Sequence, residues 1–319
     1  MDERVEQTNS EDGIDRRGML SCMTWVGTGL VWTLSGGLAA ARAFGRGVAQ
    51  ALPSDFSFVQ ISDSHIGFGK EPNKDVVRTL QAAVAKINAL PQPPAFVLHT
   101  GDLTHLAKPA EFDTVAEVLK GIKAGKVFYV PGEHDFDSDD NKLYLERFGR
   151  GTRGTGWHSF DYNGAHFVGL VNVANAKSGS PMAGLGQLGA EQLRWLAKDL
   201  AELSAGTPVI VFAHVPLWAV YEKWGWGTQD AAQAMEMLKR FGSVTVLNGH
   251  IHQVMQKIEG RITFHTARST AFPQGEPGKG TPGPLRDVPA SRLRSVLGLT
   301  SVRYVEHNSS LAIADPTLE

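Results

Sequence analysis

The chain has 319 residues, of which 42% are hydrophobic and 20% are charged, and its formal net charge is −2. This is the composition of a globular protein with enough apolar residues for a large core. The nearly neutral charge gives no footprint for nucleic-acid binding. The single cysteine, Cys22, excludes an internal disulfide, so cysteine content does not indicate the compartment.

The N-terminal segment has the pattern of an export signal. Arg16 and Arg17 precede a mostly uncharged run over residues 18–41, and residues 41–43 form a small-x-small cleavage pattern. The paired arginines resemble the twin-arginine type, which is exported by machinery for folded proteins. An uncleaved membrane anchor is the alternative, because the run is long enough to span a bilayer. Its many glycines and the cleavage pattern favour a cleaved signal over residues 1–43, and hence a periplasmic or secreted protein without a permanent membrane anchor.

The next part of the chain alternates short apolar runs with stretches of helical periodicity. Apolar residues recur at helical spacing from Val76 to Ile87, and Pro91 ends this pattern. Such alternation predicts βαβ units, in which reactive groups lie in loops beyond the carboxyl ends of the strands. The expected strands cover residues 56–61, 95–99 and 127–130, and the expected helices cover residues 76–87 and 109–122.

The second half begins with a hairpin pattern. Asn163 and Gly164 join two alternating runs, and both residues tolerate the positive φ of a tight turn. The absence of an internal repeat or long linker predicts one α/β domain over residues 44–319, in which residues 273–300 form an irregular Pro/Gly-rich segment. The elements expected here are a hairpin over 157–171, a helix carrying Leu193, Leu196, Leu200 and Leu203, a strand over 208–212, a helix over 230–240, a strand over 244–247, a hairpin over 255–265 and closing strands over 301–314.

Five clusters of Asp, Glu and His follow apolar runs. A lone histidine is more often a hydrogen-bonded core residue than a ligand, but five such clusters at successive strand ends predict convergence on metal. Two adjacent divalent ions need a bridging carboxylate, several imidazoles and open positions for water and substrate. Oxygen and nitrogen ligands without thiolate favour Mn, Fe, Zn or Co over Mg or Ca. The candidate ligands are Asp63, His65, Asp102, Glu133, His214, His250 and His252.

In their order and loop positions these clusters resemble the signature of the calcineurin-like metallophosphoesterase family, over roughly residues 56–267. The motifs that carry the resemblance are Asp63-x-His65, Gly101-Asp102, Gly132-Glu133-His134-Asp135, His214 and Gly249-His250-x-His252. The resemblance implies a four-layer α/β/β/α sandwich with a centre of two transition-metal ions, Fe, Mn or Zn, between the loops. It also implies a small-molecule phosphoester substrate, as for the cyclic-nucleotide branch of the family.

The resemblance further implies a role for each matching residue. A bridging hydroxide would attack phosphorus in line while the metals bind phosphate oxygens. His134 would protonate or stabilise the leaving oxygen, and Asp135 would orient the His134 ring. Asp63, His65 and His252 would hold one metal, His214 and His250 the other, and Asp102 would bridge them.

One position departs from the family pattern. Glu133 stands where the family usually has Asn, which binds the second metal and helps to hold the phosphate. A carboxylate here would tighten metal binding but repel a phosphate dianion. Three functions therefore remain open: an exported phosphomonoesterase or phosphodiesterase, a hydrolase of another ester class such as a phospholipid head group, or a metal-stabilised binding protein with little catalysis.

Several other features are weaker candidates. Four aromatic residues after His214 are consistent with either loop packing or an apolar wall for a substrate. His105 is a candidate partner of a metal ligand, whereas His99 lies within an expected strand and favours a core role. The GxGxxG pattern at residues 149–154 lacks the strand-turn-helix context of a dinucleotide site. The four aromatic residues are Trp218, Tyr221, Trp224 and Trp226.

Overall fold

The computed structural model describes residues 55–136, 141–173, 185–305 and 311–319. The expected export signal over residues 1–43 lies outside them. Residues 53–319 cluster as one compact unit. In the part of the chain that is described, no helix has both the length and the apolar character needed to cross a membrane.

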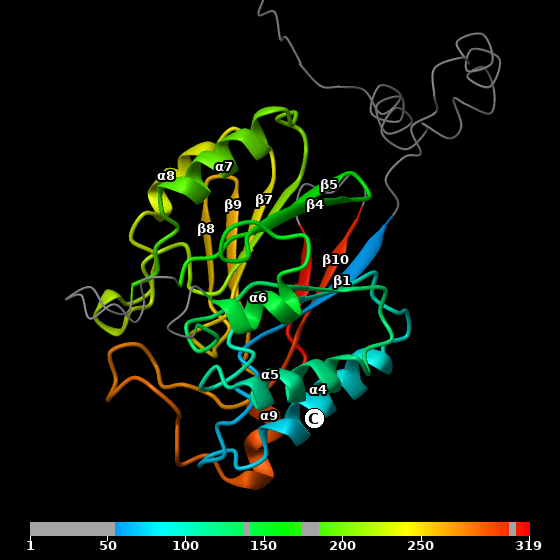
Figure 1. Cartoon of the computed structure of the whole chain (residues 1–319), viewed down its shortest axis with the longest axis vertical. Helices are drawn as coiled ribbons and strands as arrows, with labels where there is room; N and C mark the ends of the chain where they lie inside the picture. Colours follow the sequence, from blue (N-terminus) through cyan, green and yellow to red (C-terminus); the bar gives the residue numbers. More distant parts are fainter. Residues whose placement is uncertain (1–54, 137–140, 174–184, 306–310) are drawn as a thin grey trace, which may run out of the picture. The chain divides into compact units, whose positions relative to one another are not determined.

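Two β-sheets form the centre of this unit (Figure 1). The first has the order β11-β10-β1-β2-β3, and the second has the order β4-β5-β6-β7-β9-β8. In the first sheet the strands are β1 (Phe56–Ile61), β2 (Val97–His99), β3 (Val127–Tyr129), β10 (Thr300–Tyr304) and β11 (Ala312–Ala314). In the second they are β4 (His158–Tyr162), β5 (Ala165–Gly169), β6 (Val209–Ala213), β7 (Val244–Asn248), β8 (Gln256–Glu259) and β9 (Ile262–Thr266).

Helices cover the outer face of each sheet. Figure 1 shows α4 and α5 beside the first sheet, and α7 and α8 together beside the second. Each pair shares an apolar cluster with the strands that it covers. The family-like four-layer α/β/β/α sandwich is thus confirmed. The longer helices are α4 (Val76–Asn88), α5 (Pro109–Leu119), α6 (Lys142–Phe148), α7 (Ala190–Ala201) and α8 (Ala231–Leu238).

Aromatic side chains fill the space between the sheets. Phe58 in β1 and Phe96, just before β2, stack with ring centroids 5.2 Å apart. Both pack against Phe167 of the second sheet in edge-to-face contacts at 5.4 and 5.1 Å. Because such contacts add to the free energy gained by burying the rings, this inner layer holds the two sheets in a fixed relation.

The local signals in the sequence explain most elements. Asp75 caps α4 by accepting a hydrogen bond from the backbone N–H of Arg78 at 3.0 Å. Asn163 and Gly164 adopt φ of 44° and 78° between the antiparallel strands β4 and β5, which confirms the hairpin. The closing strand pair is also confirmed, since β10 pairs antiparallel with both β1 and β11.

The expected irregular segment at residues 273–300 needs a correction. Residues 273–289 carry no helix or strand, but the 3-10 helix η3 (Ala290–Arg292) and the short helix α9 (Leu293–Val296) follow them. Leu293 is buried in a small apolar cluster with Leu297 and Leu318. A helix of four residues has too few turns for periodicity to reveal it, and tertiary packing stabilises it instead.

Candidate metal centre

All seven candidate ligands lie in loops that leave the carboxyl ends of strands. Because β1, β2 and β3 run parallel to one another, as do β6 and β7, these loops gather at one edge of the two sheets. Five ligand residues have a left-handed backbone with φ between 41° and 68°, although none is glycine. Non-glycine residues seldom adopt this region, and such strain concentrates at functional sites. These five residues are Asp63, His65, Asp102, His250 and His252.

The first ligand group contains Asp63, His65 and His252, all buried. His252 Nε2 lies 3.2 Å from both Asp63 Oδ1 and His65 Nε2. His252 Nδ1 donates to the carbonyl of Phe272 at 2.6 Å, which leaves Nε2 as the free ligand atom. Burial, and then the nearby His134 and His252, hold the pKa of His65 well below its usual value, so its ring is neutral and able to bind a metal.

The second group contains Glu133, His214 and His250. Glu133 Oε2 lies 2.8 Å from His214 Nε2, and Oε1 lies 2.9 Å from His250 Nδ1. His214 Nδ1 donates to the carbonyl of Thr100 at 2.7 Å, which leaves Nε2 free. Burial would raise the pKa of Glu133, but the charges of His250 and His214 hold it well below its usual value.

Asp102 connects the two groups. Its Oδ2 lies 3.4 Å from His65 Nε2 and 3.3 Å from His214 Nε2. Its other oxygen accepts a hydrogen bond from the backbone N–H of His134 at 2.9 Å. A carboxylate in contact with imidazoles of both groups has the position that a bridging ligand requires.

The donor set fits two transition-metal ions. Three carboxylates and four imidazoles supply oxygen and nitrogen atoms, and no thiolate is among them. Four polar atoms of the second group are buried and make no hydrogen bond of acceptable geometry with a described residue: His214 Nε2, Glu133 Oε2 and both ring nitrogens of His250. Buried polar atoms rarely lack a partner, and a bound ion that accepts their lone pairs would supply one. Glu133 is placed like an oxygen ligand of the second group.

His134 lies beside the candidate ligands, as its motif predicts. However, the backbone carbonyl of His105, and not Asp135, orients its ring. Its Nδ1 donates to the backbone carbonyl of His105 at 2.7 Å, and the two rings stack at 4.9 Å. This leaves Nε2 for proton transfer. Burial alone would lower the pKa of His134, but Asp102 and Glu133 raise it overall.

The expectation that Asp135 orients the His134 ring is wrong. Within the described ranges the buried Asp135 carboxylate accepts from the backbone N–H groups of Leu103, Thr104 and Gly132 at 2.8–3.0 Å. It therefore ties the loop after β3 to the loop after β2. Burial, and then the charge of Asp102, raise the pKa of Asp135 to about 7.

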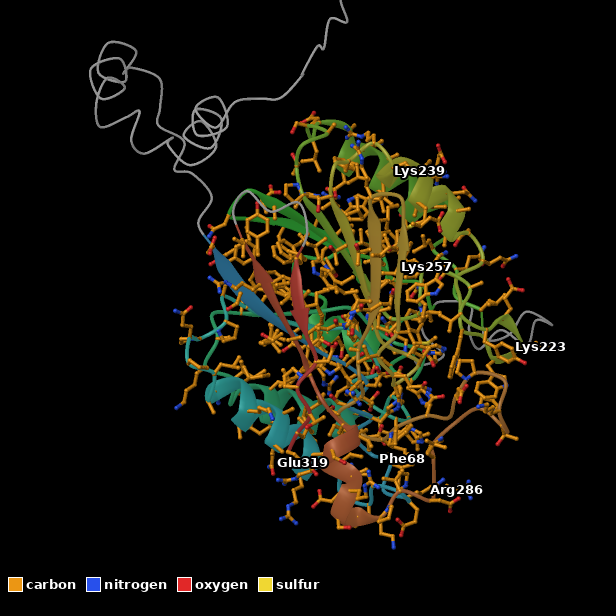
Figure 2. All side chains as sticks on the ribbon, turned by 180° about the vertical axis from the view of Figure 1, so that it is seen from behind. Phe68, Lys223, Lys239, Lys257, Arg286 and Glu319 are labelled. Atoms are coloured by element: carbon orange, nitrogen blue, oxygen red, sulfur yellow. The ribbon has the colours of Figure 1, made fainter. Side chains whose placement is uncertain are left out.

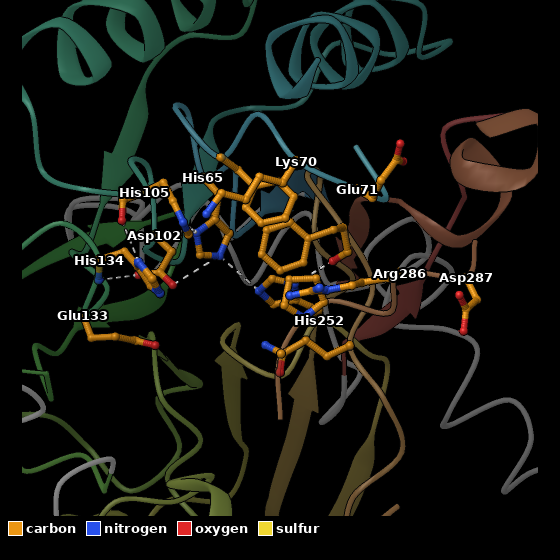
Figure 3. Close-up of a pocket in the computed structure, with 15 residues that line it drawn as sticks. His65, Lys70, Glu71, Asp102, His105, Glu133, His134, His252, Arg286 and Asp287 are labelled. Carbon is orange, nitrogen blue, oxygen red and sulfur yellow. Dashed lines mark hydrogen bonds and ion pairs between the residues drawn. The ribbon is translucent and has the colours of Figure 1, made fainter. Parts of the chain in front are cut away.

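A cavity of about 690 Å³ opens beside the ligands (Figure 3). Its inner end is formed by His65, Asp102, Glu133, His134 and His252. His105, a candidate from the sequence, also lines the cavity. Segments that the sequence did not mark as functional complete the lining, because their residue types match no motif and only the fold brings them to the site. These residues are Phe68, Lys70, Glu71, Phe272, Gln274, Gly283, Pro284, Arg286 and Asp287.

The structure distinguishes among the weaker candidates that the sequence suggested, namely the four aromatic residues, His105 and His99. None of the four aromatic residues after His214 lines this cavity; Trp218 packs on Phe264 at 5.0 Å, and Trp226 is buried. His105 does contact a ligand, with its Nδ1 3.4 Å from His65 Nδ1. Burial lowers the pKa of His99 to about 3, and its Nε2 shares a hydrogen bond with Ser64. His99 is therefore a neutral core residue.

Comparisons with known proteins agree with this geometry. Residues 56–254 match the family model of calcineurin-like phosphoesterases, and the chain belongs to that family. It is a metal-dependent phosphoric ester hydrolase.

Two curated relatives and one solved structure give the extent of the similarity. A probable cyclic nucleotide phosphodiesterase from Rhodopseudomonas palustris is 28% identical over 223 residues, covering 67% of this chain and 78% of that protein. A probable glycerophosphodiester phosphodiesterase from Arcobacter nitrofigilis is 26% identical, covering 66% and 77%. The crystal structure of a dimetal phosphatase from Danio rerio shares the fold with a TM-score of 0.61 at 15% identity, covering 83% of this chain and 96% of that one.

Proposed function

We propose that the chain is an exported dinuclear phosphoesterase that prefers small-molecule phosphodiesters. The observation that carries this proposal is the pair of ligand groups joined by Asp102. We assign the two sites to Fe, Mn or Zn, which suit such mixed ligands. When bound, these ions would polarise phosphate oxygens and lower the pKa of water enough to supply a nucleophile at neutral pH.

The chain's own residues would position the ester and move a proton. His134 holds its Nδ1 proton against the His105 carbonyl, so its Nε2 is the atom that would protonate the leaving oxygen. Asp135 keeps His134 in place indirectly, because it joins the loops that carry His134 and Asp102. In-line displacement on phosphorus is the reaction that these positions suit.

Two observations favour diesters over monoesters. The two curated relatives described above are both named as probable phosphodiesterases. In addition, the Glu133 carboxylate adds a negative charge beside Asp102 and Asp63. Its repulsion is weaker for a diester monoanion than for a monoester dianion, since the interaction between charges scales with their product.

The test compares bis(p-nitrophenyl) phosphate with p-nitrophenyl phosphate, using protein loaded in turn with Mn, Fe, Zn and Co. We expect turnover of both, faster for the diester. His134→Asn should lower kcat by about a hundredfold without changing metal content, whereas His158→Asn on β4 serves as a matched control and should change neither. Absence of cleavage of either ester with every metal would refute the phosphoesterase proposal.

We also propose export through the twin-arginine pattern. The support is the arginine pair at 16 and 17 followed by the apolar run and the cleavage pattern. Replacing both arginines by lysine keeps the charge. An export receptor that recognises the arginine side chains themselves should therefore not bind the variant, and the variant should not be exported. Cell fractionation should then find the precursor in the cytoplasm, and export equal to that of the unaltered chain would contradict the proposal.

A further inference from the structure

The Pro/Gly-rich segment at residues 273–289 is anchored directly to the candidate metal centre. Gln274 Nε2 donates to the backbone carbonyl of His250 at 2.9 Å. The Leu285 N–H donates to the Pro273 carbonyl at 2.9 Å, and Gln274 and Pro284 form an isolated β-bridge. These contacts close the segment into a loop whose two ends lie together. The residue after Leu285 is therefore placed on the cavity wall beside Gln274.

That residue is Arg286, and Lys70 is a second cation lining the same cavity. Both are exposed, and neither forms an ion pair with any residue in the described ranges. Of the acidic residues on the outer wall, Glu71 is engaged by Lys74 at 2.7 Å. Figure 3 shows the Arg286 side chain directed toward the end of the cavity where His252 lies, while the carboxylates of Glu71 and Asp287 lie away from that end.

Figure 2 agrees with this placement. It shows Arg286 in the same part of the molecule as the buried Phe68, which also lines the cavity.

The leaving group of the substrate would occupy this cavity. His134, the proposed donor to the leaving oxygen, lines it, and its volume of about 690 Å³ is far larger than a phosphoryl group needs. A cavity of this size holds an organic group of substantial size. Two cations without carboxylate partners on its wall would bind an acidic substituent of that group, because Arg and Lys donate several charge-assisted hydrogen bonds to carboxylate or phosphate oxygens.

We propose, resting on the proposed phosphoesterase function, that Arg286 and Lys70 form a subsite for an anionic group on the leaving-group side of the substrate. The preferred ester would carry a carboxylate or a second phosphate on the alcohol that is released. Carboxylate and phosphate share the recognition chemistry, and substrates bearing either one distinguish between them. Arg286 and Lys70 are specificity residues and take no part in bond cleavage.

The kinetic test uses pairs of esters that differ by one charged substituent. Methyl phenyl phosphate is compared with its 4-carboxyphenyl and 4-phosphonophenyl analogues, each with wild-type protein and the Arg286→Gln and Lys70→Gln variants. We expect each variant to raise KM for the charged esters by about tenfold, the value of one charged hydrogen bond, with kcat retained. Methyl phenyl phosphate, whose ring carries no charged substituent, should be unaffected. Arg292→Gln in η3, outside the cavity lining, is the matched control.

A binding test works without turnover and so separates this proposal from the phosphoesterase function. Calorimetry on metal-loaded protein compares phenylphosphonate with 4-phosphonobenzoate, which differ by one carboxylate. We expect the second to bind about tenfold more tightly, and the advantage to vanish in Arg286→Gln. Equal binding of the two by the wild type, or equal weakening of both in the variant, would overturn the subsite. If the binding advantage holds while no ester is cleaved, the subsite stands and the phosphoesterase proposal fails.

Discussion

At the scale of single residues, Glu133 has the most distinctive position. Its two oxygens contact different imidazoles, those of His214 and His250, at 2.8 and 2.9 Å. An asparagine there has only one oxygen for such contacts, and its amide nitrogen is a donor that a metal repels. We therefore expect the carboxylate to strengthen metal binding at the second ligand group and at the same time to disfavour substrates with a large negative charge.

Glu133→Asn should reverse both effects. We expect metal retention at the second group to weaken by about tenfold or more, since a lost contact to a charged group removes on the order of 1.5 kcal/mol. The ratio of monoester to diester turnover should rise. Metal content after dialysis against a graded chelator and the two rates measure this, with the exposed Glu117→Gln as control. If metal content and monoester turnover both stay unchanged, the charge argument is wrong.

At the residue scale, the sequence was sufficient to predict some features of the site and not others. The convergence of the candidate ligands was predictable, because Asp63, Asp102 and the histidines occur in motifs of fixed order at strand ends. The role of Asp135 was not, because its partners are backbone N–H groups of Leu103 and Thr104, which only the folded loops bring within reach. Arg286 carried no signal for the same reason: a single arginine in an irregular segment matches no motif.

At the scale of elements, the strand-end loops approach one another so closely that some positions leave no room for a side chain. A Cβ on Gly249, just after β7, would lie 2.6 Å from Asp63 Oδ2 and closer still to Ser62 Oγ. Real Cβ contacts are not this short, so one of the two loops must move. Both loops carry candidate ligands of the first group. Movement of either loop would therefore pull these ligands apart from one another.

Gly249→Ala should therefore weaken metal binding more than it weakens the fold. We expect the isolated variant to retain its helix and strand content by circular dichroism but to hold less metal than the wild type after identical loading. Gly206→Ala is the control, because its added Cβ would meet nothing closer than Ser204 Oγ at 3.8 Å. Full metal content in Gly249→Ala would mean that the loops have more freedom than these distances imply.

Most elements were predictable from local pattern, within a few residues at their ends. The helix expected to reach residue 122 ends at Leu119, and η3 and α9 went unseen in the segment expected to be irregular. Periodicity and Pro/Gly positions report long elements well. Short elements depend on contacts with distant residues such as Leu318, which periodicity does not encode.

At the scale of the whole molecule, the ligands come from both sheets. Asp63, His65, Asp102 and Glu133 follow strands of the first sheet, whereas His214, His250 and His252 follow strands of the second. Bound ions would therefore connect the two halves of the sandwich at one edge, in addition to the aromatic layer between them. Ligand binding of this kind stabilises the folded state by an amount that grows with the logarithm of the ratio of free ligand concentration to Kd.

Metal removal should lower the thermal stability of the whole protein. At a free metal concentration of about 100 times Kd, the bound ion contributes about 2.7 kcal/mol to the free energy of unfolding. We expect a chelator to lower the Tm and added Zn or Mn to restore it, as measured by calorimetry. In an Asp63→Asn, His214→Asn double variant the chelator should have little effect. An unchanged Tm in the wild type would show that the ions do not join the sheets.

The left-handed backbone at five ligand positions also constrains how this family member could change over evolution. Among residues other than glycine, asparagine, aspartate and histidine adopt that conformation most readily, so the replacement of Asp63 or Asp102 that best keeps both shape and backbone is asparagine. Such a change removes the ligand charge and leaves the chain path intact. A descendant that has lost its chemistry would thus keep its shape, and could persist as a protein that binds phosphate esters without cleaving them.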